Sequence, residues 1–517
     1  MDSDVLRRLP VALGALGLLL VLAVLILPSS GSRTDEPRAA AASPAGIVTL
    51  PDAAADPPLA VRAPRSDAWR KSELRRIKGS RTVAAALRRA WLARRIDAAT
   101  YAGYRGTWAR TRAAATRLRG TSAREQQSVL ALARGLAADR RLDSSRLGPV
   151  FLTLRRNTNF WSSRQPPRAK QRFVFGRDPV VFRYEPGQGL QIHWLGTWGK
   201  ANGRARFCLE KPKRCPKKAL RRELDRLVRL ASRRSGYDAY ESLYRFGGGG
   251  PGWVSGMTQG TAVQAMARAR RAIEAPRFGS SARRALGAFE QPPPAGIRVP
   301  DGAGSHYLMY SFAPGLRILN GNLQAIAGLY DAAQLTGSRR ARRLFRRGDR
   351  AARPAIGRYD TGAWSLYAAQ GREATLSYHR LVDGFLENLC ARTRRDAYCA
   401  PAKRFGRYLR EPTRVQVDVP SRPRARRAAS IAVWVSKRSK VVVSVARPGR
   451  ASFERVLDVG RGQYAVGWVP PLTGTYRVRV LAQGPSGPRG EARQSVRVRA
   501  PARARPVREK ERGKKTA

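Results

Sequence analysis

Four segments in the last quarter of the chain alternate apolar and polar residues at every second position. They are IAVWV at 431–435, KVVVSV at 440–445, YAVGWV at 464–469 and TYRVRV at 475–480. Side chains on a β-strand point to opposite faces in turn, so this alternation predicts strands with one buried face. Because Gly- and Pro-containing turns separate the segments, we predict an Ig-like β-sandwich over residues 412–500, with Tyr476 as a candidate corner tyrosine.

Apolar residues with helical spacing dominate the middle of the chain. A clear example is the run Leu220, Leu224, Leu227 and Leu230. A second helix is expected to end at Gly337, and the next, which carries Leu344, at Gly348. Repeated helices with glycine-containing connectors are typical of antiparallel helix pairs. We therefore predict a helical domain at 216–409, wound as an (α/α) toroid.

Two further regions precede this domain. Residues 66–145 are rich in Ala, Leu and Arg with helical spacing, and we predict a helical region to which the sequence assigns no role. Residues 146–215 contain the aromatic and β-branched stretch 173–198 with a Pro-Gly turn, and we predict a β-rich segment there. The predicted fold class is thus multidomain α+β.

The N-terminal pattern predicts a membrane anchor. Residues 11–27 are uncharged and apolar, and Arg7 and Arg8 precede them. This length is near the lower limit for a membrane span, and the arginines favour a cytoplasmic N-terminus. We predict a signal anchor at 1–27 and a flexible linker at 28–65, with a single-pass protein whose catalytic part is extracytoplasmic. Cleavage of the signal would instead give a secreted protein.

Charge narrows the choice of partner. The chain has 100 Lys and Arg residues against 36 Asp and Glu, a formal net charge of +64. A GC-rich genome also produces an excess of arginine, so the composition by itself does not establish a polyanionic partner. On the extracytoplasmic side nucleic acid is not expected, which leaves acidic polysaccharide and anionic lipid. Residues 501–517 are predicted to be a basic disordered tail.

The four cysteines form two local pairs, Cys208 with Cys215 and Cys390 with Cys399. Zinc sites usually have tighter spacing within each pair, and no histidine lies beside either pair. In an oxidising compartment two short-range disulfides are the better interpretation, and zinc is the alternative.

The candidate chemistry rests on tyrosine. HExxH, P-loop, GxSxG, CxxC and dinucleotide-binding motifs are missing from the sequence, so we predict neither a metal nor another cofactor. A tyrosine beside a fixed guanidinium has a lowered pKa and can act as a base, although tyrosines are also ordinary rim residues of helical toroids. Six tyrosines lie among arginines in the helical domain: Tyr307, Tyr310, Tyr330, Tyr359, Tyr367 and Tyr378.

Five blocks of this sequence resemble the D-glucuronyl C5-epimerase C-terminal domain family, in the same order. They are PGQGLQIHWLGTWGKAN (186–202), GWVSGMTQGTAVQAMARA (252–269), GLRILNGNLQAIAGLYDAAQLTG (315–337), YDTGAWSLY (359–367) and SYHRL (377–381). The resemblance implies an isomerase that inverts C5 of a D-glucuronyl residue within an acidic polysaccharide, giving L-iduronyl, without a cofactor.

The resemblance also implies site residues. C5–H is α to a carboxylate, so inversion needs a base on one face, an enediolate stabiliser and a proton donor on the other face. The family's tyrosines correspond to Tyr367 and Tyr378 as the acid/base pair, with Tyr310 as an auxiliary base. Candidate substrate-binding residues are Arg317, Asn320, Arg372, His379 and Gln191. For His379 a purely structural role is the alternative, and for Asn320 a role at a helix start.

The chain departs from the family pattern at three positions, one of which is a tyrosine of the family's β segment that has no clear counterpart beside residues 187–191. Met309 replaces a glutamate, and Ser377 replaces the aspartate of an Asp-Tyr-His motif. Two alternatives to an epimerase therefore stay open. A polysaccharide lyase would share the proton abstraction and then expel the C4 substituent, whereas a non-catalytic glycan-binding protein at the cell surface would be compatible with Met309. The oligomeric state, including a homodimer, is also open.

Overall fold

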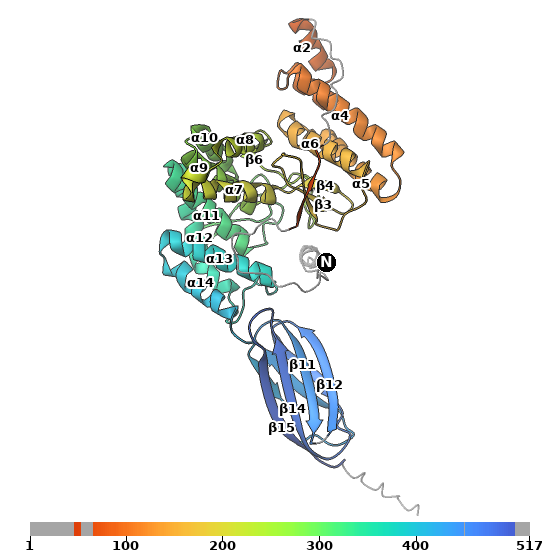
Figure 1. Ribbon diagram of the computed structural model, residues 1–517, viewed down its shortest axis with the longest axis vertical. Helices are drawn as coiled ribbons and strands as arrows, with labels where there is room; N and C mark the ends of the chain where they lie inside the picture. Colours follow the sequence, from red (N-terminus) through yellow and green to blue (C-terminus); the bar gives the residue numbers. More distant parts are fainter. Residues whose placement is uncertain (1–45, 53–65, 449, 502–517) are drawn as a thin grey trace, which may run out of the picture. The chain divides into compact units, whose positions relative to one another are not determined.

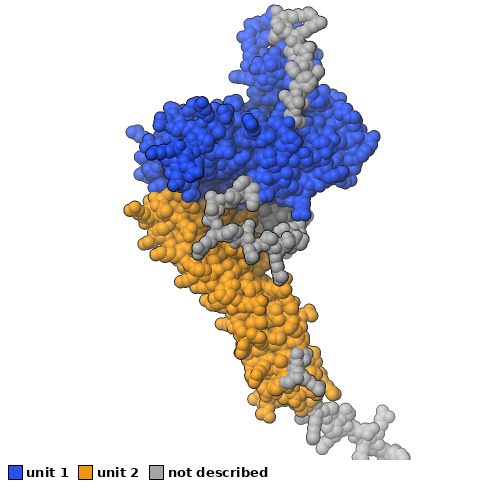
Figure 2. Space-filling model, viewed as in Figure 1, with its two compact units in different colours: residues 1–354 blue, residues 355–517 orange. Residues whose placement is uncertain are grey.

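The computed structural model describes residues 46–52, 66–448 and 450–501 (Figure 1). The chain divides into two compact units, residues 1–354 and 355–517 (Figure 2). The helices of the first unit are α2 (Asp67–Arg76), α3 (Val83–Leu92), α4 (Ala98–Arg117), α5 (Gly120–Ala138), α6 (Ser144–Trp161), α7 (Trp194–Glu210), α8 (Lys217–Val228), α9 (Gly256–Ala272), α10 (Pro276–Ala285), α11 (Leu319–Thr336) and α12 (Arg339–Ala355). Its strands are β1 (Ile47–Leu50), β2 (Arg172–Phe175), β3 (Phe182–Glu185), β4 (Gly189–Ile192), β5 (Ser232–Arg234), β6 (Tyr237–Ala239), β7 (Arg298–Asp301) and β8 (Gly304–Tyr307).

The first sheet corrects two predicted boundaries. Its order is β1-β2-β3-β4, with β1 parallel to β2 and the other pairs antiparallel. Strand β1 lies inside the predicted linker 28–65, because its β-branched IVT run completes the edge of the sheet and buries Leu50. The predicted β-rich segment 146–215 also contains helices α6 and α7, so its sheet is confined to 172–192.

Two buried polar side chains fix the β3–β4 hairpin on the preceding helices. Glu125 of α5 accepts hydrogen bonds from the Tyr184 hydroxyl and from the amides of Gly187 and Gly189. Asn157 of α6 bonds both the amide and the carbonyl of Leu190, as a neighbouring strand would. Helices α5 and α6 therefore hold this hairpin in place, and α5 belongs to the region 66–145 that the sequence left without a role.

Helix α9 packs between α7 and α11 in the first unit (Figure 1). The approach to α11 is close, since a Cβ atom on Gly260 would lie 2.6 Å from the Cα of Ala325. Gly348 was expected to end a helix but lies inside α12, where a side chain at this position would collide with the ring of Tyr307. The predicted end at Gly337 is confirmed, with this glycine in the left-handed conformation.

The second unit joins two helices to a β-structure. It begins with the 3-10 turn η3 (Ile356–Tyr359), followed by α13 (Leu376–Thr393) and α14 (Asp396–Tyr408). Its strands are β9 (Val415–Asp418), β10 (Ala429–Val435), β11 (Ser439–Arg447), β12 (Arg450–Val459), β13 (Gly462–Trp468), β14 (Gly474–Gln483) and β15 (Gly490–Val498). The boundary between the compact units thus lies ahead of α13, whereas the sequence suggested a boundary near residue 410.

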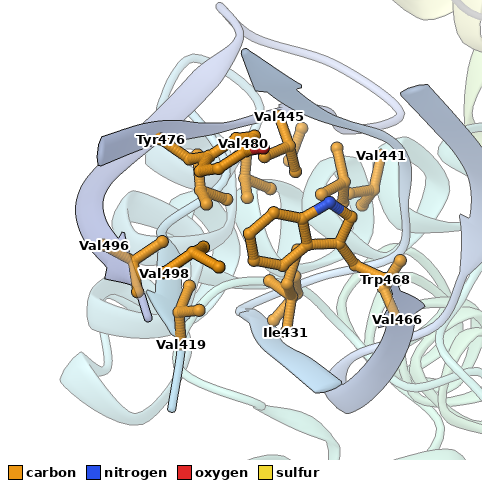
Figure 3. Packing of buried hydrophobic residues seen from close by; sticks show 14 of the residues in the cluster. Val419, Ile431, Val441, Val445, Val466, Trp468, Tyr476, Val480, Val496 and Val498 are labelled. Atoms are coloured by element: carbon orange, nitrogen blue, oxygen red, sulfur yellow. The ribbon is translucent and has the colours of Figure 1, made fainter. Parts of the chain in front are cut away.

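Two sheets of the second unit enclose one apolar core (Figure 3). Their orders are β13-β10-β9 and β12-β11-β14-β15. The predicted alternation is confirmed in β10, where Ile431, Val433 and Val435 are buried, and Trp468 fills the core from β13. The Tyr476 hydroxyl donates a 3.0 Å hydrogen bond to the carbonyl of Leu472, as a corner tyrosine does. The finer assignment to an Ig-like topology stays a prediction.

The predicted anchor at 11–27 and nearly all of the predicted tail at 501–517 lie outside the described residues. Within the described ranges, no helix combines the length and the apolarity that crossing a membrane requires.

The contact between α9 and α11 generates a stability prediction. We expect Gly260→Ala to lower the free energy of unfolding by about 3 kcal/mol, because the added methyl group meets the backbone of α11. The matched control is Gly203→Ala on α7, where no atom lies within 4 Å of the new Cβ. The control should be neutral or stabilising by about 0.5–1 kcal/mol, since alanine favours a helix. Denaturant unfolding followed by far-UV circular dichroism measures both, and equal effects would contradict the close approach.

Candidate active site

Tyr367 and Tyr378 are neighbours in the second unit. Their ring centroids are 4.8 Å apart, with the ring planes tilted by 59°, and both residues are half-buried. Tyr367 lies on a turn closed by a hydrogen bond from its amide to the carbonyl of Arg372. Tyr378 lies in the first turn of α13, whose N-terminus is capped by the hydroxyl of Thr375. The structure therefore brings together the two residues that the sequence paired as acid and base.

His379 joins the two segments that carry these tyrosines. It is fully buried, its Nε2 lies 3.0 Å from the carbonyl of Phe405, and its Nδ1 lies 2.7 Å from the hydroxyl of Ser365. A carbonyl can only accept, so Nε2 carries the proton and Nδ1 accepts from Ser365. Since Ser365 precedes Tyr367 by two residues and His379 follows Tyr378 directly, one imidazole holds both segments together.

This arrangement favours the structural role of His379 over the predicted contact with substrate. Its imidazole stacks on the indole of Trp364 at 3.8 Å with an angle of 11°, and both ring nitrogens are engaged. Burial lowers the pKa of His379 to about 4, so the ring is neutral at physiological pH. These contacts are those expected of a structural histidine.

The Asp-Thr-Gly element shapes the loop before Tyr367. The Thr361 hydroxyl accepts a hydrogen bond from the amide of Trp364, and Asp360 accepts one from the amide of Gly362. Asp360 also accepts hydrogen bonds from the Tyr408 hydroxyl and from Arg404. These contacts attach the loop to α14. Arg372 of the following turn has an exposed side chain, and its backbone carbonyl closes that turn.

Tyr310 belongs to the first unit and lies in an aromatic cluster. Its ring is 5.3 Å from Phe246, 5.5 Å from Trp253 and 5.4 Å from Phe312, and the residue is 6% exposed. Arg183 of β3 interacts electrostatically with Tyr310 and donates to the Tyr244 hydroxyl at 3.0 Å. The structure thus places a guanidinium beside this candidate base.

Arg183 keeps its charge in this half-buried position. Burial opposes the charge, but the neighbouring Tyr244, Glu185 and Tyr310 outweigh it and raise the pKa of Arg183. Burial also raises the pKa of Tyr244 to about 12, so Tyr244 is a neutral hydrogen-bond partner. Sequence reasoning missed both Arg183 and Tyr244. The signal for Arg183 is its position on a strand of otherwise buried residues, which polar recognition would explain.

Three other candidates have mainly local contacts. Gln191 on β4 is 3% exposed, and its amide donates to the carbonyl of Gln188, which closes the hairpin. Arg317 is half-buried and donates to the carbonyl of Pro314. Asn320 is buried in the first turn of α11, where Ile318 occupies the cap position and no side chain caps the helix. Its Oδ1 has no hydrogen-bond partner among the described residues.

Met309 lies where the resemblance predicts a glutamate. Its sulfur lies 3.6 Å from the hydroxyl of Ser255 and would lie 2.9 Å from a Cβ atom on Gly321. A thioether does not titrate, so this position provides no base. Among the described residues no three His, Cys, Asp or Glu side chains gather as metal ligands would. The two predicted disulfides, Cys208–Cys215 and Cys390–Cys399, are both present.

Comparison with known proteins identifies the segment that carries the tyrosines. Residues 234–407 match the family described as D-glucuronyl C5-epimerase C-terminus. Residues 234–407, which include both tyrosines, are thus similar to this family. Four of the five blocks that resemble the family lie inside the match, and the block at 186–202 lies outside it.

The similarity to complete epimerases is partial. A D-glucuronyl C5-epimerase of Caenorhabditis elegans is 30% identical over 130 residues, which cover 23% of this chain and 21% of that protein. The chain therefore spans about a fifth of the length of this curated relative.

Two solved structures have a low structural similarity to this chain. A cellobiose 2-epimerase from Spirochaeta thermophila has a TM-score of 0.32 at 13% identity, covering 56% of this chain and 72% of that one. A D-mannose isomerase has a TM-score of 0.31 at 9% identity, covering 56% and 74%.

The environment of His379 predicts a pH dependence of stability. Its folded pKa of about 4 is below the unfolded value of 6.5, so the unfolded chain binds more protons between these values. Stability should therefore fall as the pH drops from 6.5 to 4, by up to about 3 kcal/mol. In His379→Gln, whose amide can still donate to the Phe405 carbonyl, this slope should be lost.

Denaturant unfolding of both proteins at several pH values measures the difference. Other titrating groups, such as Asp383 with its pKa raised by burial to about 6, are common to both and cancel. Equal slopes in the two proteins would show that His379 is not buried as a neutral ring.

Proposed function

We propose that this chain is a D-glucuronyl C5-epimerase-like enzyme that inverts C5 of uronyl residues in an acidic polysaccharide. The contact between Tyr367 and Tyr378, inside the segment that is similar to the epimerase family, carries this proposal. The finer fold, an (α/α) toroid for the helices and an Ig-like sandwich for the strands, is part of the same proposal. No metal or organic cofactor is required by this chemistry.

The proposed reaction moves one proton off C5 and another onto it. One tyrosine, as its phenolate, takes the C5 proton, and the electron pair moves into the carboxylate to give an enediolate. The second tyrosine then donates its hydroxyl proton to C5 from the opposite face, which gives the L-configuration. The base ends protonated and the donor ends as phenolate, so the two roles are exchanged after each turnover unless solvent resets them.

The ring geometry limits how the two tyrosines can meet the sugar. A sugar held between two ring faces would need centroids roughly 7–8 Å apart, twice a carbon–carbon contact. The observed separation of 4.8 Å is too short for this. The hydroxyl ends of Tyr367 and Tyr378 must therefore reach C5, with the ring bodies in contact behind them.

A cation at the uronate carboxylate would stabilise the enediolate. Arg372 is the candidate in the second unit, because it is exposed on the turn that carries Tyr367. Arg317 stays a candidate substrate-binding residue of the first unit, where Arg183 interacts with Tyr310. Arginine suits this role since its planar guanidinium can bind both carboxylate oxygens.

The outer face of α12 supports an acidic polymer as the substrate. Arginines recur on this helix at spacings of three and four residues, so they lie along one side. The exposed ones are Arg339, Arg342, Arg343, Arg346, Arg347, Arg350 and Arg353. The apolar residues of the helix, including Leu344 and Phe345, face the protein interior instead. This row of positive charge would attract a polyanion over several sugar units.

We also propose an extracytoplasmic location, at the cell membrane through residues 11–27 or secreted if this segment is removed. The two disulfides support an oxidising compartment. The same location favours a polysaccharide over nucleic acid as the partner.

A second candidate, a non-catalytic glycan-binding protein, is favoured by Met309. One assay distinguishes the epimerase, the non-catalytic glycan-binding protein and the lyase. The full chain is incubated with a glucuronyl-containing polysaccharide, and the product is examined by NMR and near-ultraviolet absorption. New L-iduronyl signals are expected. Unsaturated, absorbing products would instead indicate the lyase, and binding without any product would indicate the non-catalytic protein.

The tyrosine pair generates a mutational prediction. Tyr367→Phe and Tyr378→Phe should each lower turnover by at least about 100-fold, because each removes a proton-transferring hydroxyl. Folding and affinity for the polysaccharide should stay near wild type, since the rings keep their contact. Tyr464→Phe in β13 is the matched control and should leave turnover unchanged. Turnover near wild type in either active-site variant would remove that tyrosine from the acid/base pair.

Met309 generates a gain-of-function prediction. Met309→Glu should raise turnover, because it restores a carboxylate where the family has one and the Ser255 hydroxyl is placed to bond it. Met309→Gln has nearly the same shape without the charge and serves as control. A turnover that is the same in both variants as in wild type would show that another group performs the role of the missing glutamate.

A further inference from the structure

Lys437 links the β-structure to the helices of the second unit. It lies between β10 and β11 and is 1% exposed, which is unusual for a lysine. Its ammonium donates to the carbonyl of Tyr408, the last residue of α14, at 2.9 Å and to that of Glu411 at 2.8 Å. The same ammonium lies 5.3 Å from the ring centroid of Trp364, over the indole that stacks on His379.

Glu373 makes a second link from the opposite direction. It lies on the turn that carries Tyr367, where Leu366 and Glu373 form a β-bridge. One of its carboxylate oxygens accepts hydrogen bonds from the backbone amides of Arg438 at 2.9 Å and Arg461 at 3.0 Å. These two amides belong to the β10–β11 and β12–β13 loops. One carboxylate from the tyrosine loop thus holds two loops of the β-structure.

Both links reach the tyrosine pair through short chains of contacts. Lys437 covers Trp364, whose indole N–H donates to the carbonyl of Ala374 and so closes the loop between Tyr367 and Tyr378. Trp364 in turn covers His379, which is bonded to Ser365. Glu373 lies on the same loop. The two tyrosine segments therefore have helices on one side and loops of the β-structure on the other.

A purely adhesive contact between two domains does not need a buried ammonium. Removing a lysine from water costs several kcal/mol, and apolar residues of similar volume often join surfaces with equal or greater stability. The ammonium instead restricts the geometry of the contact, because its interactions are satisfied only where two carbonyl groups and one ring face surround it together. This favours a positional role over simple adhesion.

We propose that Lys437 and Glu373 are positioning residues for the tyrosine pair, so that the C-terminal β-structure is an integral part of the catalytic unit and not a separate appendage. The inference rests on the proposed function for its catalytic consequence. Neither residue contacts the reacting sugar in this account. They act through the Trp364–His379 stack and through the loop at 365–375.

Hydrogen–deuterium exchange of the full chain, followed by mass spectrometry, tests the structural half of the inference. In Lys437→Met the amides of 361–379 should exchange at least about 10-fold faster than in wild type, while those of 441–445 in the sheet stay protected. Lys440→Met, an exposed lysine three residues later, is the matched control and should change neither region. Unchanged exchange at 361–379 in Lys437→Met would overturn the inference.

Turnover tests the catalytic half. In Lys437→Met kcat should fall at least about 10-fold with little change in KM, because the loop geometry is lost and not the substrate contacts. Faster exchange with unchanged kcat would also overturn the inference. If wild type shows no turnover on any glucuronyl polymer, the proposed function fails, and hydrogen–deuterium exchange still decides whether Lys437 and Glu373 order the loop at 365–375.

Variants of Glu373 test the same inference if Lys437→Met does not fold. Glu373→Ala should give the same faster exchange and lower kcat, since the amides of Arg438 and Arg461 lose their acceptor. Glu373→Gln keeps one acceptor oxygen and should restore both readouts toward wild type. A Gln variant as defective as the Ala variant would contradict the role assigned to these two hydrogen bonds. Glu454→Ala, an exposed change on β12, controls for loss of one carboxylate.

Discussion

The stack of the Trp364 indole on the His379 imidazole is the contact on which the candidate site depends. It is completely buried, and each ring has a hydrogen bond to the segment that it must hold. Neutral histidine is essential here, because a charged ring would lose the acceptor that Ser365 needs and would face a lysine ammonium across the indole. Around this stack the loop of Tyr367, the start of α13 and the β10–β11 loop converge. The proximity of Tyr367 and Tyr378 follows from that convergence.

In the first unit a second group of candidate residues is also held in place by buried polar side chains. Glu125 and Asn157 reach from α5 and α6 to hold the β3–β4 hairpin, and the hairpin carries Arg183. Arg183 then interacts with Tyr244 and Tyr310. In both units, therefore, buried polar side chains from one region of the chain fix a short segment that carries the candidate chemistry. The N-terminal helices have a structural purpose that their own sequence does not indicate.

Local patterns predicted the elements well where the pattern was strictly periodic. The alternation in 431–435 and the helix end at Gly337 are both present, and the two disulfides follow from cysteine spacing. The failures were tertiary. Strand β1 depends on pairing with β2 more than 120 positions later. Gly348 is a glycine because the ring of Tyr307 fills the space that a side chain would take, and not because a helix ends there. Neither the strand β1 nor the helical conformation of Gly348 can be predicted from the residues next to it in the sequence.

The candidate site divides in the same way. Tyr367 and Tyr378 were found through resemblance to a family, and their contact confirms that they are neighbours. For His379 the sequence left a substrate contact and a structural role open, and its burial favours the structural role. Lys437, Glu373 and Arg183 have no motif, since their significance comes from partners distant in sequence. A single arginine or lysine among 100 basic residues also has no compositional signal.

Proton exchange at C5 is the measurement that tests the central claim most directly. The full chain is incubated in heavy water with a desulfated glucuronyl polysaccharide, and C5 is observed by NMR. If Tyr367 and Tyr378 exchange the C5 proton, deuterium should enter at C5 together with L-iduronyl signals, and the L-iduronyl signals should be lost with Tyr367→Phe and with Tyr378→Phe. Absence of deuterium at C5 on every glucuronyl polymer, with the polysaccharide demonstrably bound, would contradict the account.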